Sequence, residues 1–319
     1  MAVAAGFRFP PMKILSLARW FLFLAIPMAC DAASIRLSWT GTGPAGDTRS
    51  GLHSMILGEA GSHTFLALPQ RAQGVTVHKG TVYYAEPKDQ TYSSWKVYST
   101  DLQGGSYTPL YEIDHRMTSW GFVVTDEYLY LSDSLNDTIT RSNLDGSGVE
   151  MVFDSPTVVP SPAYMTATDG RLYWTQLAID SRGRSQIWSL DHANPTQVDS
   201  ILTGLNEPQH LASSSNYLFW FDTLERVIYR SDQNGQNLQV IVSSTWARGM
   251  VADEEHLYWT NNKNLMRSDH NGGNVEIVVT SDDNMAGGFL EVIPEPGSVL
   301  LAGFGGLVLL GRRRRPMEV

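Results

Sequence analysis

The sequence is nearly free of cysteine: Cys30 is the one cysteine among 319 residues. A disulfide framework and a four-cysteine zinc site are therefore excluded. The eight histidines stand singly, and the His-Glu-x-x-His, Gly-x-Ser-x-Gly and Cys-x-x-Cys motifs are absent. Ser93-Ser94-Trp95-Lys96 matches Ser-x-x-Lys, but its companion motifs Ser-Asp-Asn and Lys-Thr-Gly are missing. The sequence thus predicts no catalytic, cofactor-binding or metal-binding residues.

Positive charge is also scarce. Residues 33–295 carry 16 Lys and Arg against 31 Asp and Glu, a net charge of −15. Such a surface repels phosphate backbones, and no basic stripe interrupts it, so nucleic acid is not an expected partner. The acidity is sufficiently explained as a means of keeping an exported β protein soluble.

What the chain does contain is a repeat built around a central aromatic residue. The aromatic stands in TVYYAE, YLYLSD, RLYWTQ, YLFWFD and HLYWTN, at Tyr83, Tyr130, Tyr173, Phe219 and Tyr258, with spacings of 47, 43, 46 and 39 residues. Trp174, Trp220 and Trp259 follow three of them, and Trp39 holds the aromatic position in IRLSWT. Four-stranded units repeating at about 40–50 residues are typical of β-propeller blades. We interpret all these aromatics as packing residues between blades.

A second run with a turn follows four of the five aromatic strands. It reads ITRSNLDGSG, IWSLDHANP, IYRSDQNGQN and LMRSDHNGGN, beginning at Ile139, Ile187, Ile228 and Leu265. The Asp-Gly and Asn-Gly pairs are what tight hairpins with positive φ require. They also resemble fragments of calcium loops, although the further spaced oxygens and closing Glu of an EF-hand are missing. No cofactor is therefore expected, and calcium remains the alternative.

The combined pattern resembles the YWTD repeats of the low-density-lipoprotein-receptor class, a six-bladed propeller family, over about Ile35 to Val292. The last position of the motif departs from Asp at Glu86, Gln176 and Asn261. The resemblance implies an all-β, six-bladed propeller of four-stranded antiparallel blades over residues 33–292. The first blade lacks an opening strand, and Gly287–Val292 (GGFLEV) is expected to supply it, which would leave no free sheet edges at the ring closure.

The N-terminal residues 1–32 read as a signal peptide for signal peptidase. Lys13 and Arg19 are its basic part and Trp20–Ala29 its apolar part, with cleavage expected after Ala32. Met12 is an alternative start, and lipoprotein cleavage before Cys30 an alternative processing site. The apolar run is shorter than the ~20 residues that a spanning helix needs, which disfavours a retained anchor.

The C-terminal residues 293–319 resemble the PEP-CTERM sorting signal. Pro294-Glu295-Pro296 comes first, the apolar segment Val299–Gly311 follows, and the basic residues Arg312, Arg313, Arg314 and Arg315 come last. The resemblance implies a short apolar helix held transiently in the inner membrane, with the arginines on the cytoplasmic side, and cleavage by an exosortase-type protease. A plain C-terminal anchor is the alternative.

The expected function is therefore a non-catalytic exported propeller, sorted to the cell surface or extracellular matrix, that binds a protein or a polysaccharide. The alternative is a propeller enzyme of the lactonase, lyase or dehydrogenase type with a site at the channel mouth, since the fold alone does not decide function. Arg182 and Arg184, in the loop Leu177–Ser185, are candidate contacts for an anionic group or else the tip of a solvated hairpin.

Overall fold

The computed structural model describes residues 35–42, 50–57, 62, 64–69, 72–117, 121–154, 162–168, 170–176, 185–243, 245–280 and 290–294. Within these ranges no helix is long and apolar enough to cross a membrane. The expected signal peptide and the expected apolar helix before Arg312 lie outside the described residues.

Five sheets are each built from four consecutive antiparallel strands. The first two contain β4 (Gln73–His78), β5 (Thr81–Pro87), β6 (Trp95–Asp101) and β7 (Thr108–Ile113), then β8 (Phe122–Val124), β9 (Tyr128–Asp133), β10 (Thr138–Asn143) and β11 (Glu150–Asp154). The next two contain β12 (Pro162–Ala167), β13 (Arg171–Gln176), β14 (Ser185–Asp191) and β15 (Val198–Leu205), then β16 (Pro208–Ser213), β17 (Tyr217–Asp222), β18 (Val227–Asp232) and β19 (Gln239–Val242). The last contains β20 (Met250–Ala252), β21 (His256–Asn261), β22 (Asn264–Asp269) and β23 (Glu276–Thr280).

A further sheet joins the beginning and the end of the described chain. Its order is β24-β1-β2-β3, with β24 (Leu290–Pro294), β1 (Ile35–Thr42), β2 (Ser50–Ile56) and β3 (Thr64–Ala67). The closing strand was expected at 287–292. In the structure β24 ends two residues later than expected, at Pro294, which pairs with Ile35. The first residue of the Pro-Glu-Pro motif is therefore part of the sheet.

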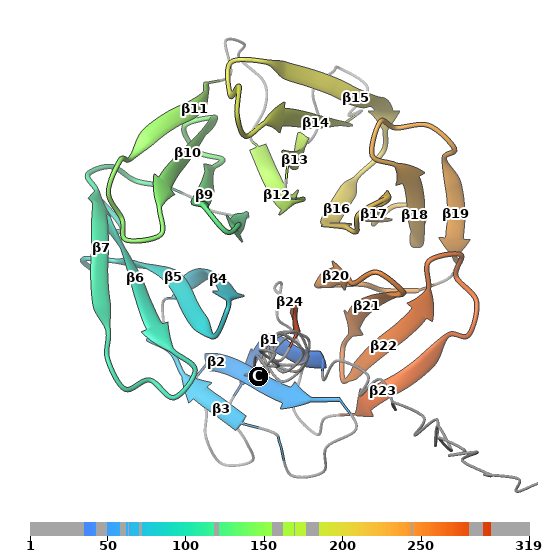
Figure 1. The fold of residues 1–319 in the computed structure, drawn as a ribbon, viewed down its shortest axis with the longest axis horizontal. Coiled ribbons are helices and arrows are strands. Elements are labelled where there is room, and N and C mark those ends of the chain that lie inside the picture. Colours follow the sequence, from blue (N-terminus) through green and yellow to red (C-terminus); the bar gives the residue numbers. More distant parts are fainter. Residues whose placement is uncertain are drawn as a thin grey trace, which may run out of the picture. The chain divides into compact units, whose positions relative to one another are not determined.

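The inner strands of these sheets form a closed ring (Figure 1). β4, β8, β12, β16, β20 and β24 contact one another in this order, and β24 contacts β4 again. The all-β propeller of four-stranded antiparallel blades that the repeat predicted is thus confirmed.

The aromatic landmarks of the repeat lie between neighbouring blades. Tyr130 packs in one cluster with Trp174 of the next blade, and Phe219 packs in one cluster with Trp259 of the next. Fully burying one such side chain stabilises a fold by roughly 1.5–3 kcal/mol. Every landmark whose side chain the structure describes is at most 5% exposed: Tyr83, Tyr130, Tyr173, Trp174, Phe219, Trp220, Tyr258 and Trp259. Trp39 lies in β1, and its side chain is outside the described part.

Arginines of the repeated Arg-Ser pair tie one blade to the next. Arg230 in β18 donates from Nη1 to the carbonyl of His270 at 2.9 Å and to Asn271 Oδ1 at 2.7 Å, both in the following blade. Its guanidinium lies 4.2 Å from the ring centre of Tyr217. Arg141 in β10 repeats the arrangement with the carbonyl of His192, at 2.9 Å. The repeat therefore encodes contacts between blades as well as strands within them.

Candidate functional site

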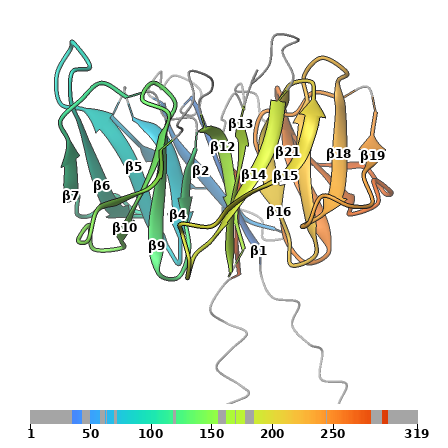
Figure 2. The same ribbon diagram turned by 90° about the horizontal axis from the view of Figure 1, so that it is seen from above.

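The strands end on two faces, which Figure 2 shows edge-on. We call face A the one formed by the turns from first to second and from third to fourth strands, such as 214–216 and 233–238. Face B is formed by the turns from second to third strands, such as 223–226, and by the connections between blades, such as 245–249. First strands run from face B to face A, so β24 ends at Pro294 on face A.

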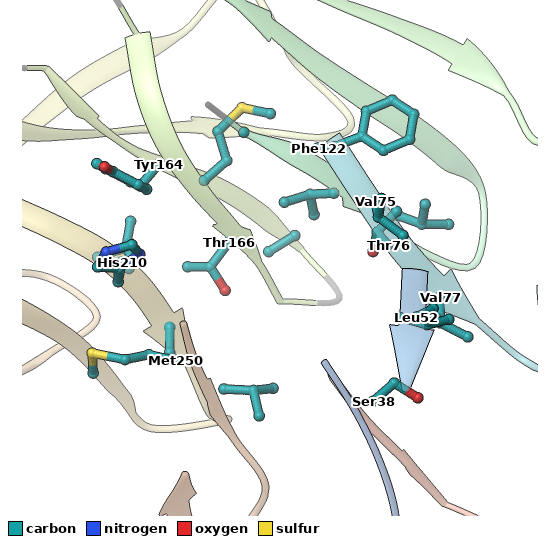
Figure 3. A pocket seen from close by; sticks show the side chains of 18 residues that line it. Ser38, Leu52, Val75, Thr76, Val77, Phe122, Tyr164, Thr166, His210 and Met250 are labelled. Carbon is teal, nitrogen blue, oxygen red and sulfur yellow. The ribbon is translucent and has the colours of Figure 1, made fainter. Parts of the chain in front are cut away.

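A cavity of about 170 Å³ lies among the inner strands. Aliphatic side chains dominate its lining, which includes Leu52, Val75, Val77, Leu211 and Met250. Two large polar side chains, Tyr164 of β12 and His210 of β16, lie beside each other on one side of it, across from Val75 and Val77 (Figure 3). The cavity therefore has one polar wall.

Tyr164 and His210 occupy the same position of the repeat. The central aromatics pair across the sheet with Thr76, Val123, Thr166, Ala212 and Val251 of the inner strands. Two residues before each of these stand, in order, Gly74, Gly121, Tyr164, His210 and Gly249. Three blades thus carry glycine where two neighbouring blades carry a tyrosine and a histidine.

A histidine at position 210 is expected to lower the stability of the fold, for two reasons. Its φ is +51°, close to the +56° of Gly74, and a non-glycine residue there costs roughly 1–3 kcal/mol. Its buried Nδ1 has no hydrogen-bond partner in the described structure, which costs about 1–3 kcal/mol more. Burial, and then the positive charge of Arg248, lower the pKa of His210 to about 4, so its imidazole is neutral at pH 7.

Tyr164 is held firmly against this histidine. The ring centres of Tyr164 and His210 are 4.7 Å apart at an angle of 53°. The Tyr164 hydroxyl donates to Gln209 Oε1 at 3.2 Å. Burial raises the pKa of Tyr164 to about 12, so the phenol also stays neutral. The polar wall is therefore preorganised and uncharged.

The connection 245–249 places further side chains on face B close to this wall. Trp246 is 43% exposed, and the guanidinium of Arg226 lies 4.9 Å from its ring centre. Arg248 is exposed, and its backbone N–H donates a hydrogen bond to the carbonyl of Thr260, at 3.0 Å. Arg248 is not among the lining residues of the cavity, although its positive charge contributes to the lowered pKa of His210.

A second hollow, of about 380 Å³, lies at face A and is lined by His78, Asp126, Glu127, Thr168 and His192 among others. The Asp126 carboxylate is already paired there, since its Oδ1 lies 3.0 Å from His78 Nε2 and 2.8 Å from Lys79 Nζ. We therefore regard the axial cavity as the better candidate site.

The Asp-Gly segments form hairpin turns, with Gly146, Gly235 and Gly272 at φ of +84°, +81° and +79°. Asp269 Oδ1 accepts from the N–H groups of Asn271, at 2.8 Å, and Gly273, at 2.9 Å. The Asp269 carboxylate thus has hydrogen-bond donors within its own turn, without a bound ion. Among the described residues no group of three or more His, Cys, Asp or Glu is arranged to hold a metal.

The remaining candidate residues from the sequence are not brought together in one site among the described residues. Ser93 donates to Asp89 Oδ2 at 2.6 Å, while Lys96 Nζ lies 3.3 Å from Glu112 Oε1, so the Ser-x-x-Lys side chains are engaged separately. Arg182, Arg184 and the sorting-signal residues from Glu295 to Arg315 lie outside the described part of the chain.

Comparison with known proteins gives two findings. Residues 292–315 match the PEP-CTERM protein-sorting motif. In fold, the chain is similar to a chain of the nidogen/laminin complex, with 17% identity and a TM-score of 0.60 over 81% of this chain and 98% of that one. It is also similar to TolB from Acinetobacter baumannii, with 12% identity and a TM-score of 0.62 over 82% of this chain and 67% of that one. The tricorn protease is similar with 13% identity and a TM-score of 0.55 over 77% of this chain and 26% of that one.

The fold and these likenesses define a β-propeller. The matched motif, which includes Pro294–Pro296 and Arg312–Arg315, adds that this propeller is exported and sorted by an exosortase to the cell surface.

Proposed function

We propose that this protein is a non-catalytic binding propeller displayed at the cell surface or in the extracellular matrix, where face B binds a protein or a polysaccharide. The observation that carries the proposal is that the C-terminal end of the propeller and the candidate site lie toward opposite faces. The propeller ends at Pro294 on face A, while Tyr164, His210 and Arg248 lie toward face B. Attachment through the C-terminal end therefore leaves face B pointing away from the cell.

The lining of the cavity supports binding over the enzymatic alternative. Among the described lining residues, His210 and Tyr164 are the titratable groups, and the rest are aliphatic, aromatic, glycine or hydroxyl-bearing residues. General acid–base chemistry usually combines several such groups in one site. The repeat pattern and the likeness to a chain of the nidogen/laminin complex further support a propeller of the YWTD type.

In this proposal the leader 1–32 is removed by signal peptidase, with Met12 as an alternative start. The segment after Pro294 is held in the inner membrane until an exosortase-type protease cuts near Pro-Glu-Pro. The protein then moves from this periplasmic intermediate to the surface or the matrix.

We expect the double variant Glu295→Ala/Pro296→Ala, and deletion of Val299–Val319, to abolish sorting while leaving the fold intact. Both changes leave β24 and its pairing with β1 untouched, whereas a change at Pro294 would alter the sheet. Cell fractionation and immunoblotting measure the sorting, and the melting temperature of the purified variants measures the fold. Unchanged surface display in both variants would refute the sorting mechanism.

A further inference from the structure

We propose that closure of the propeller ring and cutting of the sorting signal compete for the same residues, so that the exosortase-type protease acts on a chain in which the C-terminal end of β24 has left the sheet. The proposal deepens the proposed function and rests on its processing step, because it says which state of the propeller the protease accepts.

The sorting motif and the propeller share residues. The motif matches residues 292–315, whereas β24 covers Leu290–Pro294. The shared residues are paired with β1: Val292 with Leu37, Ile293 with Arg36, and Pro294 with Ile35. The sorting motif thus begins inside the sheet that closes the ring.

Pairing with β1 occupies main-chain groups that recognition of the motif would use. Strands in a sheet are held together by hydrogen bonds between their N–H and C=O groups. A peptide bound in extended form is held by the same groups. The other edge of β24 faces the axis of the ring, where β4 and β20 flank it (Figure 1). A protease would have to enter the ring to reach that edge, so the stretch Val292–Pro294 becomes available only when it leaves β1.

The closed ring also leaves little chain between the propeller and the apolar segment. β24 ends on face A at Pro294, and the segment that we expect in the membrane begins at Val299. The chain between these two residues spans at most about 18 Å when fully extended. A small domain is about 30 Å across, so a protease at the motif would meet face A. Opening Val292–Pro294 adds about 10 Å of free chain.

The end of β24 is suited to local opening. Its last residue, Pro294, has no N–H to donate to a neighbouring strand. The ends of a chain open locally at a low free-energy cost, whereas the core of a sheet opens only with the whole fold. Two further pairs, Leu290 with Trp39 and Glu291 with Ser38, lie outside the matched motif. These pairs hold the strand in register while the last three residues open, so the cut does not require unfolding of the propeller.

Insertion of a second Val-Ile-Pro directly after Pro294 tests the competition. The first copy completes β24, and the second copy begins a motif that is free of the sheet. We expect this full-length chain to be cut at least about threefold faster than the wild type, because no pairing has to open first. Pulse–chase labelling of cells measures the conversion of the precursor to the shorter form, and the melting temperature of the purified chain should be unchanged.

Insertion of Gly-Ser-Gly after Gly297 is the matched control for length. It adds as many residues but leaves Val292–Pro294 as the only copy, so it should speed the cut less than the second Val-Ile-Pro does. An equal gain in the two chains would assign the effect to length alone and would overturn the proposal.

The double variant Ser38→Cys/Glu291→Cys tests the opposite change. The two residues lie directly opposite each other in β1 and β24, at the separation that a cross-strand disulfide bridges. Residues 33–319 contain no cysteine that would compete. With the disulfide formed, as a non-reducing gel shows, we expect the cut to slow at least about threefold, because the strand end opens less often. A reductant should restore the rate, and each single variant should be cut like the wild type.

The same disulfide placed in the chain with two Val-Ile-Pro copies should leave its rate of cutting unchanged, since that motif does not depend on the sheet. Equal rates for the oxidised and reduced double variant, or no gain from the second Val-Ile-Pro, would overturn the competition and leave the sorting itself intact. A wild-type chain that is never cut would instead contradict the processing step of the proposed function.

Discussion

We expect a chain that stops after residue 289 to lose cooperative folding, whereas a chain that stops after Pro296 keeps it. The shorter chain lacks β24, which pairs with β1 over five residue pairs and contacts β4 and β20. Its loss opens the ring on both sides of one blade and exposes unpaired strand edges. A domain has only about 5–15 kcal/mol of stability in total, so most of it should be lost.

The measurement is thermal unfolding followed by circular dichroism, with urea unfolding as a check on cooperativity. The chain ending at Pro296 is the matched control, because it removes the sorting segment and keeps every strand that the structure describes. If the two truncated chains unfolded at the same temperature, the closure of the ring through β24 would be wrong.

The second large effect is expected at the hairpin glycines that pack against the preceding blade. A Cβ on Gly272 would overlap the carbonyl oxygen of Ile241 in β19, and a Cβ on Gly235 would overlap that of Ile201 in β15. Both glycines also have positive φ. We expect Gly272→Ala to cost about 2–4 kcal/mol, since the strain of the backbone adds to overpacking between two blades.

Two other glycines separate the cost of backbone strain from the cost of overpacking between blades. Gly80 has a φ of +81° with nothing within 4 Å of an added Cβ, so Gly80→Ala should cost about 1 kcal/mol from the backbone alone. Gly170 has neither feature, and Gly170→Ala should change stability by less than about 0.5 kcal/mol. Urea unfolding of the four alanine variants gives the series. A cost at Gly272 no larger than at Gly80 would show that the blades do not meet at this turn.

The blades could be predicted from the sequence because each repeat carries its own strand and turn signals. The aromatic spacing and the Asp-Gly pairs act within about 40 residues, and both appear in the structure as expected. The closing strand was expected at 287–292, whereas β24 extends to Pro294, which pairs with Ile35. The end of this strand is set by its pairing with β1 from the other end of the described chain, which the repeat pattern does not specify.

The site was not predicted, although a signal for it is present in the sequence. Aligning the inner strands shows Tyr164 and His210 where other blades have glycine, but only the structure shows that the two positions line one cavity. Arg230 is similar: the Arg-Ser pair was visible as a repeat, whereas its acceptors lie 40 and 41 residues further along the chain. The repeat thus marks residues that contact the next blade, but their particular partners depend on how neighbouring sheets pack, which only the structure shows.

The outward orientation of face B is tested most directly by cysteine labelling on intact cells. Residues 33–319 contain no cysteine, so Leu224→Cys on face B and Gln236→Cys on face A each provide one thiol, both in the blade β16–β19. Leu224 is 66% exposed and Gln236 is also exposed, so the purified proteins should react alike with a membrane-impermeant maleimide. On cells, we predict faster labelling of Leu224→Cys than of Gln236→Cys. Equal or reversed rates would contradict display of the propeller with face B outward.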